Sequence, residues 1–429
     1  MGDGHRFPPR FRLRKSIPAG FAASRSMEQG GKGRARLTAC RKSRQLGLRS
    51  PGRAHRLPGH LNDNQSREDT MSELRSTLFG CCACCPPPMG RREFLAGGIA
   101  ALGLGAFAAG RNAAAQAKPH RIDVHHHVSP PSWLDAVKKA KLDNPPMVNW
   151  SPQKSLDDMD QAGIATAIVS PTTPQVNFLD HDKDAAARIA RESNEYAKKL
   201  MSDHPGRFGL FAMLPLPHID ASLEEIAYSF DTLKADGVGI MTSYGDKWLG
   251  YPQFAPVWEE LNRRKATVYT HPTGANCCVN LVQGITEATI ELGTDTNGTI
   301  ASLIFSGTSQ RYKDINWIFS HGGGVLTAVA ERFQIQMVSR PPYKDKFTRA
   351  IVDGELNRFY YDTAQISNAV TIGALAKLVP ISQIVYGTDY PYRTGFEHVK
   401  GLGAVFAGTD LMAIERQNAL RIIPRLKTA

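Results

Sequence analysis

Eight short runs of β-branched, aromatic and other apolar residues alternate with longer stretches of helical periodicity from residue 121 onward. This alternation is typical of βα units around a parallel sheet. Eight such units in about 310 residues predict an α/β fold, a (β/α)8 TIM barrel with loop insertions. The runs span residues 121–128, 165–171, 208–214, 237–243, 266–272, 316–323, 358–364 and 383–391.

Helices are expected between these runs, for example at 184–202, 222–234, 254–264 and 370–378. Ser155 is expected to cap the start of an earlier helix, and Gly163 to follow its end. Two segments are longer than a simple connection requires. We expect residues 129–161 to form a helix plus a lid or small subdomain over the barrel mouth, and residues 273–308 to carry helices near the same mouth.

Polar side chains stand where several of the expected strands end. They are His125 and His127 in the first run, His271 in the fifth, His321 in the sixth and Asp389 in the eighth. Active sites of such barrels lie at the carboxyl ends of the strands, so these residues should converge. Strand residues two apart point to the same side, so His125 and His127 face the interior while His126 faces the wall.

Two imidazoles on one side of a strand suit a divalent ion. A borderline-soft metal such as zinc needs further nitrogen or oxygen ligands, which His271 and Asp389 would supply. An isolated histidine is more often a hydrogen-bonded structural group. That interpretation is kept for the histidines without a place at a strand end, which are His181, His204, His218 and His398, and for the wall-facing His126.

The positive charge of the chain lies almost entirely in its first part. Of the 52 Lys and Arg and 40 Asp and Glu, residues 1–117 hold 20 and 7, which leaves 32 and 33 for the remainder. A nucleic-acid surface on the barrel is therefore not indicated. Residues 1–70 lack apolar periodicity and are expected to be a disordered basic extension, untranslated in the native host if translation begins at Met71 or Met89. An RNA-binding or targeting arm is the alternative, although aromatic residues for stacking are almost absent.

Residues 71–117 are expected to form a leader segment. Arg91 and Arg92 precede an apolar run of about fifteen residues that ends before Ala115-Gln116-Ala117. This pattern resembles a twin-arginine export signal with an A-x-A cleavage site, which would make Lys118 the first mature residue. The run is shorter than the roughly twenty residues that span a bilayer, so a permanent anchor is the weaker interpretation. We expect a periplasmic protein, or a cytoplasmic one if the segment is not a signal.

Cysteines and glycines carry little further signal. Five of the seven cysteines lie upstream of the expected cleavage point, four of them in "CCACC" at 81–85, without a second ligand pair at zinc-finger distance. The other two, Cys277 and Cys278, are adjacent and geometrically poor for an ordinary disulfide. "HGGG" at 321–324 and "GLGAVFAG" at 401–408 lack the spacing of nucleotide-binding loops.

Together, "IDVHHH", "VYTHP", "FSHGGG", "RFYYDTA", "YGTDYP" and the closing "RQNALRII" resemble the amidohydrolase superfamily. Within it, the resemblance is to the branch of aminocarboxymuconate-semialdehyde decarboxylase, including its salicylate-type members, and it covers most of residues 121–424. The resemblance implies a mononuclear metal site with His125, His127, His271 and Asp389 as ligands and His321 as a nearby acid or base.

The resemblance also bears on a second metal and on substrate binding. Relatives with two metals usually bridge them through a carboxylated Lys, a Glu or a Cys near the fourth strand, and "GVGIMTS" offers none, since Lys247 lies beyond it. The family holds substrate carboxylate with arginine, and Arg340 in "SRPP" stands at the family's spacing after the "HGGG" turn. The alternative is that Arg340, like Arg332, is a surface arginine without a role in substrate binding.

These features predict a non-oxidative decarboxylase that releases CO2 from an aromatic hydroxy acid or related conjugated carboxylate. His321 and Asp389 would relay the proton, and one divalent ion, zinc or alternatively manganese, would polarise the substrate. A mononuclear hydrolase of a lactone or amide is the alternative, and a secreted binding barrel that merely holds metal is a third class. The resemblance further implies a homodimer, and no nucleic-acid partner or stable membrane anchor is expected.

Overall fold

The computed structural model describes residues 119–427 of the chain. The basic extension, the twin-arginine-type leader, the "CCACC" cluster and Lys118 lie outside the described residues.

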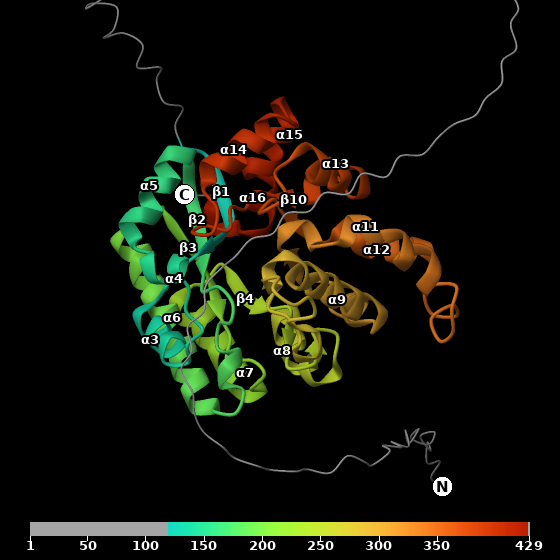
Figure 1. The fold of residues 1–429 in the computed structure, drawn as a ribbon, viewed down its shortest axis with the longest axis horizontal. Helices are drawn as coiled ribbons and strands as arrows, with labels where there is room; N and C mark the ends of the chain where they lie inside the picture. Colours follow the sequence, from blue (N-terminus) through green and yellow to red (C-terminus); the bar gives the residue numbers. More distant parts are fainter. Residues whose placement is uncertain (1–118, 428–429) are drawn as a thin grey trace, which may run out of the picture. The chain divides into compact units, whose positions relative to one another are not determined.

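Eight parallel strands form one sheet in the order β1-β2-β3-β4-β7-β8-β9-β10 (Figure 1). They are β1 (Arg121–His127), β2 (Ile164–Ser170), β3 (Phe208–Met213), β4 (Gly237–Met241), β7 (Thr267–His271), β8 (Asn316–Phe319), β9 (Tyr360–Asp362) and β10 (Ile384–Val385). Each lies within or beside a run expected from the sequence, and the TIM-barrel prediction is confirmed. A two-stranded hairpin, β5 (Ser243–Tyr244) with β6 (Lys247–Trp248), follows the fourth barrel strand.

The barrel closes where the segment after β10 hydrogen-bonds to β1. Val124 N–H donates to Tyr386 O at 3.0 Å, and His127 N–H donates to Tyr390 O at 2.8 Å. Asp389 N–H donates to His125 O at 2.8 Å. The chain that carries Asp389 is therefore hydrogen-bonded directly to the strand that carries His125 and His127.

Apolar side chains fill the barrel, and the C-terminal segment closes its amino end. The cluster joins strand residues to α16 and the turn after it: Ile122, Val124, Ile168, Phe211, Tyr269, Ile318, Tyr360, Val385, Ala419, Ile422, Ile423 and Leu426. Thr267 Oγ1, at the start of β7, donates to Ile422 O at 2.6 Å, which fixes this plug at the amino ends of the strands. The opposite, carboxyl ends are left for polar groups.

The helices are α3 (Pro131–Lys139), α4 (Pro145–Asn149), α5 (Pro152–Ala162), α6 (Lys183–Asp203), α7 (Ile219–Tyr228), α8 (Ala255–Arg263), α9 (Glu291–Phe305), α10 (Thr308–Arg311), α11 (Leu326–Glu331), α12 (Arg349–Arg358), α13 (Ala369–Leu378), α14 (Gly395–Gly403), α15 (Gly408–Met412) and α16 (Asn418–Ile422). They surround the strands in Figure 1. The four helices expected from the sequence are present as α6, α7 with its continuation η2 (Ser229–Leu233), α8 and α13.

One capping prediction is wrong. Ser151, not Ser155, caps α5: its side chain accepts from Lys154 N–H, and Pro152 occupies the first helical position. Proline is favoured there because its missing N–H has no helical partner to lose. Ser155 is buried one turn into the helix. Gly163 ends the helix in the left-handed conformation at φ 64°, as expected.

Both long insertions contain helices. Residues 129–161 form α3, α4 and α5, and α3 and α4 share a hydrophobic cluster with α6 around Trp133, Met147 and Ile189. Residues 273–308 form two short turns, η4 (Asn276–Cys278) and η5 (Glu287–Thr289), followed by α9. Both insertions begin at the carboxyl end of a barrel strand, so they flank the mouth.

The "HGGG" segment forms a tight turn, η6 (His321–Gly323), as expected from the sequence. Gly324 has φ +67°, and a Cβ there would overlap the carbonyl oxygen of Gly293 in α9. Only glycine allows this close approach of two backbones. The turn thereby joins the strand end that carries His321 to α9.

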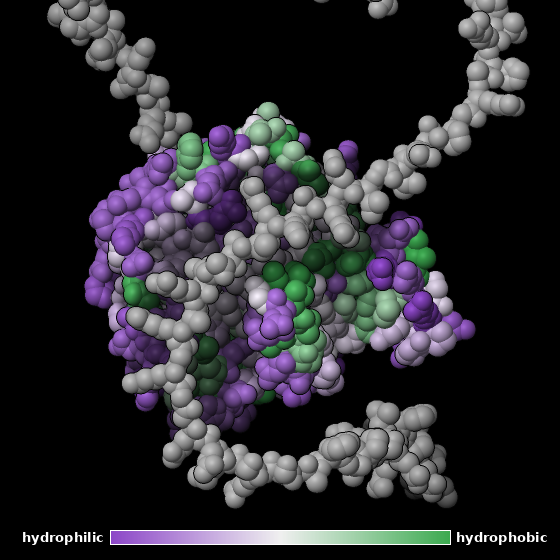
Figure 2. Space-filling view, in the orientation of Figure 1, coloured by the Kyte–Doolittle hydropathy of each residue, from purple (hydrophilic) through white to green (hydrophobic). Residues whose placement is uncertain are grey.

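The surface is uneven in polarity. Figure 2 shows mostly hydrophilic side chains over α3 to α7, and more hydrophobic ones around α9, α11 and α12. A groove of about 390 Å³ lies there, lined in part by Tyr251, Phe305, Met337 and Tyr343. Within residues 119–427, no helix combines the length and the apolar character needed to cross a membrane.

Candidate metal centre

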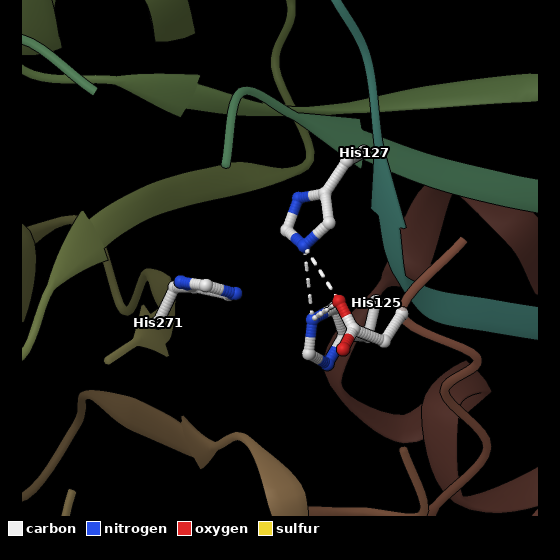
Figure 3. Close-up of side chains that lie close together, drawn as sticks. His125, His127 and His271 are labelled. Atoms are coloured by element: carbon white, nitrogen blue, oxygen red, sulfur yellow. Dashed lines mark hydrogen bonds and ion pairs between the residues drawn. The ribbon is translucent and has the colours of Figure 1, made fainter. Parts of the chain in front are cut away.

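Three histidines and one aspartate meet at the carboxyl ends of the strands. One ligand atom from each of His125, His127, His271 and Asp389 lies within 4.8 Å of every other, and all four residues are buried. Figure 3 shows the three imidazoles approaching one another, two from β1 and one from β7. The structure therefore brings together four of the five residues expected at the strand ends as one possible ligand set.

Hydrogen bonds fix the orientation of all three rings. His125 Nδ1–H donates to Asp362 Oδ2 at 2.7 Å. His127 Nδ1–H donates to Ser170 O at 3.2 Å, and His271 Nδ1–H to Pro272 O at 2.9 Å. With each Nδ1 facing an acceptor, the Nε2 atoms remain available as ligands, which is how metal-binding histidines are usually oriented.

The spacing of the ligand atoms suits a single ion. His125 Nε2 lies 3.1 Å from His127 Nε2 and 3.2 Å from Asp389 Oδ1, and His127 Nε2 lies 3.1 Å from the same oxygen. Ligands about 2.05 Å from a tetrahedral ion are about 3.3 Å apart. The donor set and its spacing thus fit a divalent metal.

The electrostatics of the cluster also call for a cation. Burial alone would lower the pKa of His125, but the Asp362 and Asp389 carboxylates raise it to about 10. Burial opposes ionisation of Asp389, yet His125 and the hydrogen bonds from three histidines hold its pKa well below the usual range. Burial and the neighbouring His127 and His125 lower the pKa of His271. A proton or a metal ion must balance the two buried carboxylates.

The two oxygens of Asp389 have different partners. Oδ1 faces His125 and His127, whereas Oδ2 lies 3.3 Å from His321 Nε2 and accepts from Gln365 Nε2 at 2.8 Å. The His321 side chain is 16% exposed, so it lies between the cluster and solvent. His321 is therefore placed beside the cluster as the sequence predicts, at hydrogen-bonding distance from one ligand.

A second buried network lies behind the cluster, on the wall side of β1. His126 Nδ1 pairs with Asp123 Oδ2 at 3.0 Å, and its Nε2 pairs with the Ser155 hydroxyl. Asp123 also accepts from His125 N–H at 3.0 Å and from Thr388 N–H at 3.1 Å. This carboxylate ties β1 to the residue that precedes Asp389. His126 faces the wall as expected, away from the three converging imidazoles.

The other residues considered from the sequence lie outside the cluster. His181 is exposed beside Asp180, His204 follows α6, His218 bonds to Leu179 O, and His398 bonds to Ser367. Within residues 119–427, the cluster is the one group of this kind, and Lys247 lies exposed on β6. Arg332 and Arg340 are exposed, on or just after η7 (Arg332–Met337). No side-chain hydrogen bond joins Arg340 to any described residue.

Sequence reasoning missed Asp362 and Gln365. Asp362 ends β9 with its side chain fully buried, and besides His125 it accepts from His321 N–H at 2.8 Å and Ala364 N–H at 3.0 Å. Its place in "RFYYDTA", at the end of a strand, was the signal that could have identified it. Gln365 lies in the turn after that strand, and nothing in the sequence marks it.

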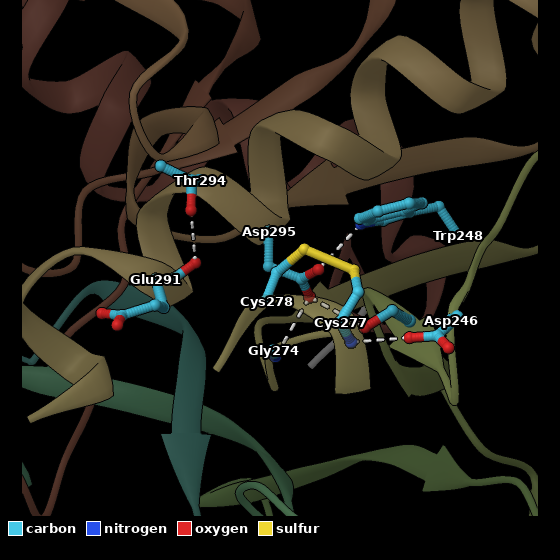
Figure 4. Close-up of a disulfide and its surroundings, with 9 residues drawn as sticks. Asp246, Trp248, Gly274, Cys277, Cys278, Glu291, Thr294 and Asp295 are labelled. Atoms are coloured by element: carbon cyan, nitrogen blue, oxygen red, sulfur yellow. Dashed lines mark hydrogen bonds between the residues drawn. A yellow bond between two sulfur atoms is a disulfide. The ribbon is translucent and has the colours of Figure 1, made fainter. Parts of the chain in front are cut away.

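Cys277 and Cys278 form a disulfide between adjacent residues in η4, just beyond β7 (Figure 4). Adjacent cysteines were expected to be poorly placed for an ordinary disulfide. The pair is nevertheless bonded, with its Cα atoms 3.8 Å apart, closer than in ordinary disulfides. Cys277 N–H donates to Asp246 Oδ1 at 2.6 Å. Nearby, Asp295 of α9 accepts from Trp248 Nε1 at 2.7 Å and from Gly274 N–H at 3.2 Å. These carboxylates hold the loop after His271 against the mouth.

Comparison with known proteins agrees with the fold and the motifs. A family model described as amidohydrolase matches residues 122–425. A relative named decarboxylase yanB, from Aspergillus niger, is 37% identical over 72% of this chain and 88% of its own length. The 6-methylsalicylic acid decarboxylase acuB of Aspergillus aculeatus is 33% identical over 72% of this chain and 97% of its own length.

A solved structure shares the fold. The dihydroxybenzoic acid decarboxylase of Polaromonas sp. JS666, with bound manganese and the inhibitor 2-nitroresorcinol, superimposes with a TM-score of 0.65 at 20% identity, over 72% of this chain and 98% of that chain. Together with the family match and the two relatives above 30% identity, these findings place the chain: it belongs to the amidohydrolase family.

Proposed function

We propose that the chain is a metal-dependent, non-oxidative decarboxylase of an aromatic hydroxy acid of the salicylate type. One observation carries the proposal: three imidazoles with their Nδ1 atoms satisfied and one carboxylate converge at the mouth. The relatives named decarboxylase yanB and 6-methylsalicylic acid decarboxylase acuB support the choice of reaction.

The proposed ligands are His125, His127, His271 and Asp389, with one divalent ion. Imidazole and carboxylate ligands suit zinc, and they overlap with those that manganese accepts. Zinc is the first choice because three of the four ligands are nitrogens, and manganese, which the Polaromonas neighbour binds, is the alternative. When bound, the ion would supply positive charge that polarises a carboxylate and an adjacent hydroxyl oxygen of the substrate.

Decarboxylation of an arene requires a proton at the ring carbon that bears the carboxylate. That carbon becomes tetrahedral on protonation. The bond to the carboxylate then breaks, its electron pair restores the aromatic ring, and CO2 leaves. We assign the transfer of this proton to His321 and Asp389. His321 Nε2 lies 3.3 Å from Asp389 Oδ2, and the His321 side chain reaches solvent at the mouth.

Arg340 is proposed to bind a substrate carboxylate, as the family spacing suggests. Its exposure leaves the guanidinium free to make a bidentate pair. The proposal predicts that Arg340→Met raises KM for hydroxybenzoates by about ten- to a hundredfold, the usual cost of losing a charge-assisted hydrogen bond, with a smaller change in kcat. Arg332→Met is the matched control, since Arg332 is also exposed but lies eight residues earlier, at the start of η7. An unchanged KM for Arg340→Met would remove the assignment.

The test of function is CO2 release from a panel of hydroxybenzoates by metal-loaded protein. A decarboxylase evolves one CO2 per substrate consumed. A hydrolase of lactones or amides instead releases acid from those substrates without CO2, and a binding barrel turns over neither. Acid release without CO2 would therefore replace the proposal with the hydrolase alternative.

His127→Ala tests the site itself. It should abolish CO2 release and lower bound metal below one ion per chain while the thermal unfolding of the metal-free protein stays similar. His181→Ala is the control, since His181 is exposed and does not belong to the ligand set. Full turnover by His127→Ala would contradict the ligand assignment.

We also propose the following organisation for the chain: a basic extension at 1–70, a leader with a twin-arginine-type signal at 71–117, and one barrel at 118–429 that is exported to the periplasm and forms a homodimer. The signal assignment predicts a mature N-terminus at Lys118 in the native host. N-terminal sequencing and light scattering of the purified protein test the two statements separately. A mature N-terminus upstream of Arg91 would contradict export by this signal.

A further inference from the structure

Gln365 and Arg393 form a short chain of hydrogen bonds that ends on Asp389. Gln365 Nε2 donates to Asp389 Oδ2 at 2.8 Å, and Gln365 Oε1 accepts from Arg393 at 3.3 Å. A guanidinium offers only donors, so it can face only the oxygen of the amide. The Arg393 contact therefore directs the amide NH2 group toward the carboxylate.

Arg393 is itself held in place. Its Nε donates to Glu397, in the first turn of α14, at 2.6 Å. Its backbone N–H donates to Asp389 O at 3.2 Å. The residue that orients the amide thus belongs to the same turn as the carboxylate that the amide contacts.

Three residues in and beside this series of hydrogen bonds have a strained backbone, which indicates that their conformation is functionally important. Gln365 has φ +61°, Asp389 φ +64° and His321 φ +53°. Side chains other than glycine rarely adopt such angles, and they persist where the surroundings determine the conformation. These three residues meet at one atom, Asp389 Oδ2. A glutamine that only completed a turn would have no need to be directed at this oxygen.

We infer that Gln365 is a positioning residue for Asp389, oriented in turn by Arg393. A carboxylate can rotate about its last bond and offer either or both oxygens to the imidazoles. The amide donor holds Oδ2 on the side of His321, which leaves Oδ1 facing His125 and His127. Gln365 thereby keeps the oxygen assigned to the metal separate from the oxygen assigned to the proton. This inference extends the proposed function to two residues that the family motifs do not include.

Gln365→Glu is the most direct variant. It preserves the shape of the side chain and its contact to Arg393, but replaces the donor that faces Asp389 with an acceptor. We expect kcat to fall by about ten- to a hundredfold, the usual effect of losing a hydrogen bond to a charged group, with KM changing less than about threefold. Because Gln365 is exposed, the variant should fold normally.

Arg393→Met tests the second link of the chain. It leaves the amide present but no longer directed, so the loss in kcat should have the same sign and be smaller. Since both residues act on one atom, the double variant should be no worse than Gln365→Glu alone. Arg349→Met is the control: Arg349 is exposed and makes the same type of ion pair along a helix, with Asp353 on α12.

A second measurement does not depend on turnover. Dissociation constants for zinc and manganese, measured by competition with a chelator, should increase in Gln365→Glu and Arg393→Met and stay unchanged in Arg349→Met. Wild-type kcat together with wild-type metal affinity in Gln365→Glu would overturn the inference, as would strictly additive losses in the double variant. If the wild type releases no CO2, the proposed function fails, while the metal affinities still decide the role of Gln365.

Discussion

Asp362→Asn tests how the orientation of a metal ligand affects metal binding, because it changes the hydrogen-bond partner of His125 and leaves all four proposed ligands in place. Asp362 contacts no proposed metal position, but it accepts His125 Nδ1–H at 2.7 Å with both side chains fully buried. Its other oxygen accepts two backbone N–H groups, at 2.8 and 3.0 Å, and those contacts hold the orientation of the carboxylate. In the variant, the asparagine oxygen satisfies the two N–H groups, so its NH2 group must face His125.

An NH2 group facing His125 Nδ1 forces the ring to accept there and to carry its proton on Nε2. That nitrogen is the one that faces His127 and Asp389, so a protonated Nε2 cannot bind a metal. Loss of a carboxylate behind a metal-binding histidine typically costs ten- to a hundredfold in metal affinity, about 1.4–2.7 kcal/mol. The same loss should appear in the metal requirement for CO2 release.

The assay is competition with a chelator, with metal bound per chain read by elemental analysis. Asp353→Asn is the control, because Asp353 is a carboxylate on α12 that pairs with Gln334 and Arg349 and does not belong to the ligand set. Thermal unfolding without metal checks that both variants fold. Wild-type affinity in Asp362→Asn would refute the argument that this hydrogen bond sets the His125 tautomer.

Three further outcomes follow from the geometry. Metal binding should release close to one proton at pH 7, because the Asp362 and Asp389 carboxylates outweigh burial and raise the pKa of His125 to about 10, while the pKa of His271 is lowered. The apparent metal affinity should therefore rise about tenfold per pH unit. Calorimetry in two buffers of different ionisation enthalpy measures the proton release, and a pH-independent affinity would contradict it. Gly324→Ala should destabilise the protein by about 3 kcal/mol, since a Cβ would overlap Gly293 O and φ is +67°; denaturant unfolding tests it, with Gly354→Ala, where a Cβ meets open space, as the control, and equal stabilities would disprove it. Replacing Cys277 and Cys278 together by Ser should change stability by less than about 1 kcal/mol, because a bond between adjacent residues closes a very short loop; a large drop in melting temperature would show that this turn supports the barrel.

The strand-end residues could be predicted because two regularities act together. Alternation along a strand separates His125 and His127 from His126, and a parallel barrel brings distant strand ends to one face. Both regularities are visible in the sequence, so the barrel and the convergence of His271 and Asp389 with the first pair follow from it.

The partners of these residues could not be predicted in the same way. Gln365 and Arg393 meet because two turns adopt left-handed backbone angles, and no residue type in either turn demands them. Ser155 is not the cap, because Ser151 followed by Pro152 is the stronger start signal. The disulfide at Cys277 depends on the shape of a single turn, which the sequence does not define.

We propose that His125, His127, His271 and Asp389 hold one metal ion that decarboxylation requires. The most direct test is to remove metal from the purified protein with a chelator, restore it in known amounts, and measure CO2 release from a hydroxybenzoate at each step. If these four residues hold the essential ion, metal-free protein releases no CO2, and release recovers linearly and saturates at one equivalent of zinc or manganese per chain. Full CO2 release from metal-free protein, or saturation only at two equivalents, would contradict it.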